Sequence, residues 1–216
     1  MKRRELAALG GLVLGASALG WPELALAQRK PEEGKDYRAL EKRAPVKAPA
    51  GKIEVVEFFW YSCPHCNAFE PLLNAWLKKL PPDVAFRRVP VAFRDDFVPQ
   101  QRLYYTLEAL GKLDELHDKV FAAIHQQHQP TDREDRILAF AQANGLDKAK
   151  FQELYHSFSV STKAREARQL QDQYQVDGVP ALGVAGRFYT DGTMAGGMDR
   201  ALQVLDYLIG EARKTK

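Results

Sequence analysis

The chain has 216 residues, of which 45% are hydrophobic and 27% charged, and its formal net charge is +3. Charges of both signs are dispersed along the chain, and this balance argues against a nucleic-acid or membrane-surface partner. The length allows one domain with an insertion or two small domains, and the only two cysteines leave none for a structural disulfide framework.

The N-terminus has the pattern of a secretory signal peptide. Residues 2–4 are basic, residues 6–19 form an apolar region interrupted by glycines, and residues 25–27 read Ala-Leu-Ala, a small-x-small cleavage signal. We therefore predict export, with cleavage after Ala27. A membrane anchor is the alternative, but residues 6–19 are shorter than the roughly 20 apolar residues that a spanning helix needs. The arginine pair within residues 2–4 leaves a twin-arginine export route open.

The folded part is predicted to begin near Lys52. Residues 28–50 are rich in Lys, Glu and Pro without apolar periodicity, so they are predicted to form an extended N-terminal arm outside the core. Residues 53–60 are apolar on both alternating phases, which predicts a central strand covered by helices on both faces. Residues 84–91 form a second predicted strand, in which Pro90 indicates a sheet edge or a strand end.

A helix is predicted to begin directly after Cys63. Cys63 can cap it, and Pro64 stands at the first helical position, where its missing N–H costs nothing. Pro81 and Pro82 end the helix. From helical spacing, its buried face is predicted to consist of Phe69, Leu72, Leu73, Trp76, Leu77 and Leu80.

Residues 96–175 have helical periodicity throughout, and such a block is too long for an ordinary loop between strands. They are predicted to form a helical subdomain inserted into an α/β unit, whose two parts are residues 51–95 and residues 176–216. The second part is predicted to contain a hairpin and a closing helix, formed by residues 181–184, 188–190 and 201–209.

Capping signals divide the helical block. Asp95 or Asp96 can cap its first helix, which should end at Gly111. Residues 131–134, Thr-Asp-Arg-Glu, read as a capping box that opens a later helix ending at Asn144. The remaining helices are expected over residues 112–127, 147–158 and 159–174.

Cys63 and Cys66 are the residues that point to a reaction. Two cysteines three positions apart at a strand-to-helix junction can close a local disulfide, with the first sulfur exposed at a helix N-terminus. The helix dipole and a protonated His65 would favour the Cys63 thiolate. Cys66 lies one turn further in and is suited to resolving a mixed disulfide. The pattern predicts a dithiol redox site.

A structural staple and a metal site are the alternatives for the cysteine pair. A disulfide closing so short a loop would contribute only roughly 2 kcal/mol to stability. Zinc sites commonly need four ligands, and the chain offers only His117, His125 and His128 in the distant helical block. His125 and His128 are expected to face solvent, so no metal is expected.

Glu57 and the segment Gly178-Val179-Pro180-Ala181 are further candidates. A carboxylate in a strand covered on both faces is costly unless it has a use, so Glu57 is a candidate for proton transfer toward Cys66. A strand end that reaches solvent is the alternative for Glu57. Pro180 precedes a predicted strand, and on local sequence alone its peptide bond is expected to be trans.

The Phe58-to-Cys66 segment, the helical block and residues 178–181 together resemble the DsbA family of bacterial periplasmic thiol:disulfide oxidoreductases. The resemblance covers roughly residues 35–213, and it is specific because a Pro-His dipeptide between the cysteines distinguishes this family from thioredoxins and isomerases. Residues 89–93 depart from the family's longer strand, which leaves the strand end and any lysine partner of Glu57 open. The resemblance implies a thioredoxin fold with an inserted helical subdomain. The site residues that it implies are Cys63 as the nucleophile, Cys66 as the resolving thiol, Glu57 as the buried acid, a cis Pro180, and Val179 with its backbone toward the substrate.

The expected function is that of a monomeric, exported oxidase, which donates its 63–66 disulfide to folding exported proteins through a mixed disulfide on Cys63. The resemblance implies a periplasmic location and reoxidation by a DsbB-type membrane quinone oxidoreductase. No cofactor and no nucleic-acid partner is expected. Two alternatives remain, namely an isomerase or reductase kept reduced by another donor, and a non-catalytic thioredoxin-fold binding or chaperone module.

Overall fold

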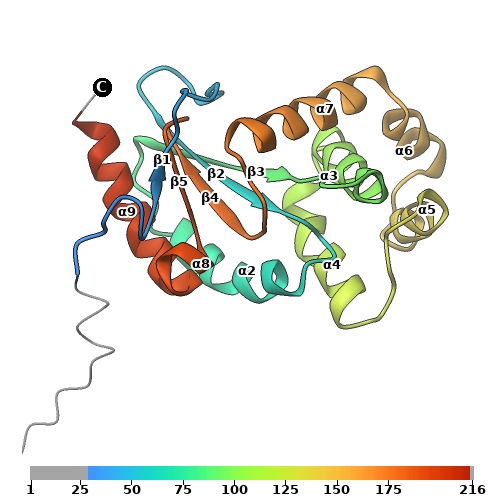
Figure 1. Cartoon of the computed structure of the whole chain (residues 1–216). Coiled ribbons are helices and arrows are strands. Elements are labelled where there is room, and N and C mark those ends of the chain that lie inside the picture. The colour runs from blue at the N-terminus through green and yellow to red at the C-terminus, as the bar shows by residue number, and fades with distance from the viewer. Residues whose placement is uncertain (1–28, 215–216) are drawn as a thin grey trace, which may run out of the picture. The chain divides into compact units, whose positions relative to one another are not determined.

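A five-stranded mixed sheet lies at the centre of the fold (Figure 1). The computed structural model describes residues 29–214, so the predicted signal peptide lies outside the described residues. The strands in chain order are β1 (Arg38–Ala39), β2 (Ile53–Phe59), β3 (Val84–Pro90), β4 (Ala181–Val184) and β5 (Phe188–Asp191). They lie side by side in the order β1-β5-β4-β2-β3, with β3 parallel to β2 and the other pairs antiparallel.

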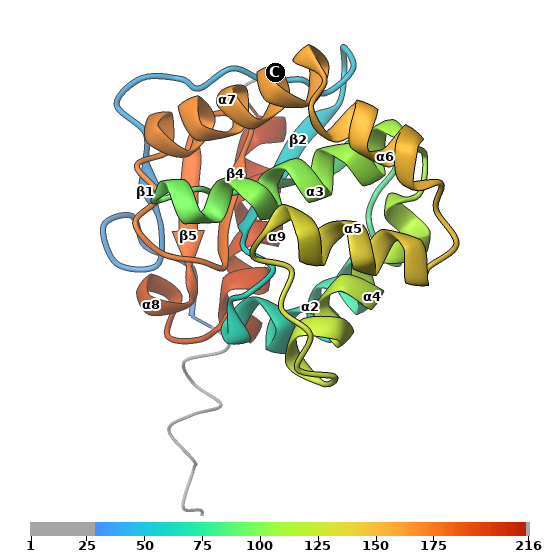
Figure 2. The same ribbon diagram turned by 90° about the vertical axis from the view of Figure 1, so that its right-hand side faces the viewer.

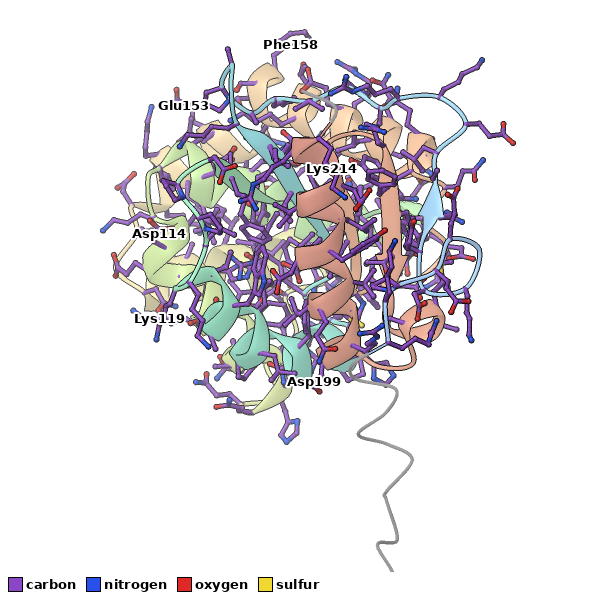
Figure 3. All side chains as sticks on the ribbon, turned by 90° about the vertical axis from the view of Figure 1, so that its left-hand side faces the viewer. Asp114, Lys119, Glu153, Phe158, Asp199 and Lys214 are labelled. Atoms are coloured by element: carbon purple, nitrogen blue, oxygen red, sulfur yellow. The ribbon has the colours of Figure 1, made fainter. Side chains whose placement is uncertain are left out.

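Helices cover both faces of this sheet. They are α2 (Pro64–Leu77), the short 3₁₀ helix η1 (Asp95–Phe97), α3 (Val98–Ala109), α4 (Leu113–His125), α5 (Glu134–Ala143), α6 (Lys148–Tyr155), α7 (Phe158–Gln173), α8 (Gly192–Ala195) and α9 (Met198–Arg213). α2 and α9 pack on one face, whereas α3 and α7 pack on the other (Figures 1 and 2). Figure 3 shows α9 on the near side, with Asp199 labelled near its start and Lys214 just after its end. In the described part of the chain, none of the helices is long and apolar enough to span a membrane.

β2 is the central strand that its two apolar phases predict. All seven of its residues are buried. Alternate side chains of a strand point to opposite faces, and accordingly Val55 packs with α2 and α9, whereas Val56 packs with α3 and α7. Residues 60–62 connect the end of this buried strand to Cys63, so the cysteine motif starts from the core of the sheet.

α2 begins where its sequence predicts, with Cys63 as the N-cap and Pro64 as the first helical residue. The predicted buried face is correct for Phe69 and Leu73, which enter the core with α9. It is wrong for Leu72, which is 39% exposed. Consecutive residues of a helix are turned by about 100°, and this turn carries Leu72 away from the side that the sheet and α9 cover.

One edge strand of the sheet, β3, was predicted from the sequence, and the other, β1, was not. β3 is an edge strand and ends at Pro90, so both readings of this proline are confirmed. The N-terminal arm was predicted to lie outside the core, yet Arg38–Ala39 pairs with β5 at the opposite edge, and Tyr37 is buried against Phe188. Edge pairing uses backbone groups, so a two-residue strand forms there without any apolar periodicity.

α3 to α7 lie between β3 and β4 in the chain, as the long helical block predicts. The predicted capping box is wrong. α5 has Arg133 as its N-cap without a side-chain bond, while Thr131 is buried and accepts a hydrogen bond from Gln100 of α3. The Thr131 hydroxyl therefore bonds to Gln100 of another helix and does not cap α5. Neither Asp95 nor Asp96 caps α3, because both lie in η1, which precedes it.

Tyr174 joins the end of α7 to the β4–β5 hairpin. Its hydroxyl accepts a hydrogen bond from the Gly186 N–H at 3.0 Å. Its ring lies against Gly183 in β4, where any Cβ would overlap the ring. Gly183 is therefore required by close packing, and the contact holds the helical block against the strand that follows the Val179-Pro180 segment.

Candidate active site

The two cysteines lie at the junction of β2 and α2, and both are unbonded thiols. The Cys63 Sγ accepts a hydrogen bond from the Cys66 N–H at 3.4 Å. On its other side, the Cys63 thiol donates to the Val179 carbonyl at 3.4 Å. The first sulfur therefore lies between the open end of α2 and the segment that leads into β4.

The two sulfurs have opposite electrostatic environments. Hydrogen bonding from the Cys66 thiol is the main cause that lowers the pKa of Cys63 to about 6, against the opposing effect of burial. The backbone N–H groups of Cys66 and His65 and the charge of His65 contribute in the same direction. Burial raises the pKa of Cys66 far above its usual range. At neutral pH the arrangement favours a thiolate on Cys63 and a protonated thiol on Cys66, so Cys63 is the sulfur that attacks or leaves more readily.

A groove of about 560 Å³ opens beside the exposed His65. One wall is the Val179–Pro180 segment, whose peptide bond is cis, as the family resemblance implied. Residues of α8, the first residue of α9 and Arg38 of β1 also line the groove. The structure thus brings His65 to the same groove as Val179 and Pro180, which lie far from it in the sequence. Pro64 lies exposed at the start of the helix.

Glu57 is fully buried in β2, so the alternative of a strand end that reaches solvent is wrong. Arg88 lies opposite it in β3, with Arg88 Nε 3.1 Å from Glu57 Oε2. The contact lacks hydrogen-bond alignment, and neither side-chain oxygen of Glu57 has a hydrogen-bond donor. Burial, and then the charge of Glu70, raise the pKa of Glu57 to about 8 despite Arg88. The cationic partner left open by the sequence is therefore an arginine.

Arg88 also connects Glu57 to a buried polar network. Its Nη2 donates to Glu70 Oε2 of α2 at 2.8 Å. The other oxygen of Glu70 lies 3.2 Å from Nε2 of His117 in α4, and Nδ1 of His117 lies 2.9 Å from the Tyr61 hydroxyl. Burial alone would raise the pKa of Glu70, but the hydrogen bond from His117 and the charge of Arg88 lower it. Burial lowers the pKa of His117.

Sequence reasoning missed Glu70, Arg88 and His117. An acidic residue one turn after Cys66, on the inner face of α2, is a signal by which Glu70 could have been found. Arg88 can be identified only from the register of β2 and β3. No local pattern indicates that His117 reaches α2.

The histidines of the helical block require a correction. They were taken to be distant from the cysteines, yet His117 is buried in contact with Tyr61. His125 was expected to face solvent, yet its Nε2 donates to the Tyr61 carbonyl at 2.8 Å. Only His128 is exposed as expected. Packing of α4 against the start of α2 brings these side chains to the motif.

Glu70, His117 and Asp118 are the one group in the described residues whose three potential ligand atoms lie within 4.8 Å of one another. Both ring nitrogens of His117 already have hydrogen-bond partners, and Glu70 is paired with Arg88. The group is therefore organised as a hydrogen-bond network with a fixed cation of its own.

Comparison with known proteins gives one consistent result. A family model described as a DSBA-like thioredoxin domain matches residues 54–208. The thiol:disulfide interchange protein DsbA of Burkholderia cepacia is 41% identical over 86% of this chain and 88% of its own length. The Azotobacter vinelandii protein of the same name is 41% identical over 96% of this chain and 98% of its own length.

Solved structures agree with these relatives. A crystal structure of a single-substitution variant of Pseudomonas aeruginosa DsbA has a TM-score of 0.83 at 40% identity, and the match covers 86% of this chain and all of that one. The oxidoreductase DsbA of Xylella fastidiosa has a TM-score of 0.79 at 32% identity, over 85% of this chain and 98% of that one. The expected α/β thioredoxin fold with a helical insertion is thereby confirmed.

Proposed function

We propose that this chain donates a disulfide to exported proteins as they fold. It belongs to the DsbA family of thiol:disulfide oxidoreductases, and this membership is the starting point of the proposal. The observation that carries this proposal is the contrast between the two sulfurs, with a pKa of about 6 for Cys63 and a raised pKa for the buried Cys66. A sulfur that is stable as a thiolate is a good leaving group, so a disulfide that contains it is a strong oxidant.

The reaction starts from the Cys63–Cys66 disulfide. A substrate thiolate attacks Cys63 Sγ, a substrate–Cys63 bond forms as the Cys63–Cys66 bond breaks, and Cys66 leaves with the electron pair. A second substrate thiolate attacks the substrate sulfur of this mixed disulfide, and Cys63 leaves as a thiolate. The substrate has then lost two electrons and gained a disulfide, and the protein is left as the dithiol.

Glu57 supplies the proton that Cys66 needs when it leaves. Burial makes a Cys66 thiolate costly, so Cys66 leaves more readily if it is protonated as the disulfide breaks. With a pKa raised to about 8, Glu57 is mainly protonated at neutral pH and can donate. Arg88 then lies in place to pair with the carboxylate that remains.

Val179 and Pro180 form the substrate-binding edge. When Cys63 is protonated, its thiol donates a hydrogen bond to the Val179 carbonyl. In the thiolate and in the mixed disulfide Cys63 no longer donates, so this carbonyl is available to an N–H of an extended substrate. The groove beside it includes His65 and the side chains of Met194 and Met198. Methionine adapts to varied shapes, which suits an enzyme with many substrates.

An external acceptor must reoxidise the protein, because the chain has no cysteine other than Cys63 and Cys66 to take the electrons. A DsbB-type membrane quinone oxidoreductase is the acceptor that the family suggests. The signal pattern of residues 1–27 supports a periplasmic location, with cleavage after Ala27, and we take the mature protein to be a monomer.

Thiol trapping in living cells tests the proposed direction of electron flow. Cells are quenched with acid and treated with an alkylating agent, and the redox state of the 63–66 pair is read from the mass added. An oxidase should be found mostly as the disulfide. A mostly reduced pair would support a reductase or isomerase, and failure of the purified protein to oxidise a dithiol peptide would revive a binding module without redox activity.

A further inference from the structure

Three side chains of the helical block hold the two residues that precede Cys63. His117 Nδ1 accepts from the Tyr61 hydroxyl at 2.9 Å, His125 Nε2 donates to the Tyr61 carbonyl at 2.8 Å, and Gln100 Nε2 donates to Ser62 Oγ at 2.7 Å. We call His117, His125 and Gln100 the helical clamp. Figures 1 and 2 show α4 beside the junction of β2 and α2, where this segment lies.

His117 connects both sides of the dithiol turn. Arg88 donates a hydrogen bond to Glu70, so Glu70 is ionised and acts only as an acceptor. His117 must then carry its proton on Nε2, which donates to Glu70. Its Nδ1 is unprotonated and accepts a hydrogen bond from the Tyr61 hydroxyl. Tyr61 lies just before Cys63, and Glu70 lies one helical turn after Cys66. One imidazole from the insertion therefore cross-links the two ends of the motif.

The surroundings of His117 leave it little freedom. Its ring makes edge contacts with Phe59, Tyr104 and Phe121, and Tyr61 and Glu70 are buried with it. Water cannot replace a lost partner in such a site without repacking of these rings. Both ring nitrogens of His117 have partners, and buried hydrogen bonds of this kind hold a side chain in one geometry.

The position of the Cys63 sulfur depends on the segment that the clamp holds. The Cys63 N–H donates to the Trp60 carbonyl at 3.0 Å, so Tyr61 and Ser62 form the turn that delivers Cys63 to α2. The two contacts of its sulfur, with the Cys66 N–H and the Val179 carbonyl, are both 3.4 Å long. Because α2 and the Val179 segment come from different parts of the chain, a small shift of the turn changes both contacts.

We propose that His117 is a positioning residue for disulfide exchange, and that through the helical clamp the inserted helices set the reactivity of Cys63. This inference rests on the proposed function. The clamp fixes the turn so that the Cys63 thiolate receives the helix N–H, which stabilises the reduced protein and makes the disulfide a stronger oxidant. Without the clamp, the thioredoxin-fold part keeps its cysteines but loses part of this stabilisation.

The test compares two buried tyrosines of the same aromatic cluster. Tyr61→Phe removes the hydroxyl bound by His117, and Tyr104→Phe removes a hydroxyl that bonds to the Arg88 carbonyl at 3.4 Å and has no part in the clamp. His117→Phe removes both bonds of the imidazole, and His117→Gln keeps a donor. For each full-length mature variant, the thiolate absorbance against pH, the equilibrium with glutathione, and the melting temperatures of both redox forms are measured.

We expect Tyr61→Phe and His117→Phe to raise the Cys63 pKa and to shift the glutathione equilibrium about tenfold toward the protein disulfide, which corresponds to about 30 mV. His117→Gln should recover part of this shift, and Tyr104→Phe should change the equilibrium less than twofold. Equal losses of melting temperature for Tyr61→Phe and Tyr104→Phe, with the Cys63 pKa and the equilibrium unchanged in both, would overturn the proposal and leave His117 a packing residue.

Two further arms keep the result interpretable. If His117→Phe does not fold, Ser62→Ala takes its place, because it removes only the hydroxyl bound by Gln100. A rise in the Cys63 pKa of this variant supports the clamp, and an unchanged pKa contradicts it. Wild-type protein that fails to oxidise a dithiol peptide refutes the proposed function by itself. The comparison of Cys63 pKa values between Tyr61→Phe and Tyr104→Phe still decides whether the clamp acts on the sulfur.

Discussion

Cys63 and Cys66 differ in reactivity because the fold exposes only one of them. Cys63 is 7% exposed and faces the Val179 carbonyl, whereas Cys66 has no exposed surface. A substrate can therefore reach the first sulfur alone, and the second can act only from inside the protein.

This asymmetry predicts the outcome of the Cys66→Ser variant. Cys63 can still attack a substrate disulfide, forming a mixed disulfide as one substrate thiolate leaves, but no neighbouring sulfur can release the product. Covalent complexes should accumulate and appear on non-reducing gels as bands that disappear with dithiothreitol. Cys63→Ser is the control and should form none. Equal amounts of complex with both variants would show that the assigned roles are wrong.

Glu57→Gln tests the proposed proton donor. Reduction of the 63–66 disulfide by a small thiol should slow about a hundredfold or more, as is usual for loss of a general acid. The rate, corrected for ionisation of the attacking thiol, should also lose the inflection near pH 8 that follows from the raised Glu57 pKa. Stopped-flow fluorescence across pH 6–9 measures both effects.

Glu54→Gln is the matched control for this change. Glu54 is also buried in β2, but it is hydrogen-bonded by Arg87 and by the Lys47 N–H. Its loss should affect stability and leave the pH profile intact. An inflection near pH 8 that persists in Glu57→Gln would assign the proton to another group.

At the scale of elements, the contact between α7 and β4 keeps the helical block against the sheet. Tyr174 reaches the sheet only because Gly183 has no side chain, and its hydroxyl accepts from Gly186 in the hairpin. The same hairpin follows the Val179–Pro180 segment, so this contact bears on the groove as well as on the core.

Gly183→Ala should destabilise the protein by about 1–3 kcal/mol, the usual cost of forcing an extra carbon into a packed site. The added Cβ would overlap the Tyr174 ring and a methyl group of Val56. Gly210→Ala in α9 is the control, because its Cβ would meet nothing and a helical alanine is favoured by roughly 0.5–1 kcal/mol. Urea unfolding of both variants measures the difference, and two substitutions with the same effect would contradict the packing argument.

At the scale of the whole molecule, redox state and stability are linked through Cys63. Its pKa is about 6 in the folded dithiol and about 8.5 in an unfolded chain. The thiolate therefore stabilises the folded reduced form fully above about pH 8.5, and this contribution is lost as the pH falls through about 6.

The reduced protein should accordingly melt at a higher temperature than the oxidised protein at pH 7, and the difference should shrink between pH 7 and pH 5. Calorimetry of both redox forms across this range measures it. Ionisations unrelated to the cysteines affect both forms alike, so they cancel in the difference. An oxidised form that melts higher at pH 7 would contradict the assignment as an oxidant.

Local patterns in the sequence were sufficient for the framework of this protein. The two apolar phases of residues 53–60 identified the central strand, the Cys63-Pro64 pair identified the start of α2, and the helical period of residues 96–175 identified the insertion. Each of these signals depends only on residues that are close to one another in the sequence. The family resemblance added the cis Pro180, which local sequence alone would have made trans.

Only the tertiary structure decided what surrounds the dithiol. The Arg88 partner of Glu57 follows from the register of two strands, and the contacts of His117 with Tyr61 and Glu70 follow from the packing of α4 against α2. The edge strand β1 and the use of Thr131 by Gln100 likewise depend on partners far away in the chain. A sequence pattern records the buried or exposed state of a residue and its helical or extended period, but the identity of a partner across a core is set by how whole elements pack.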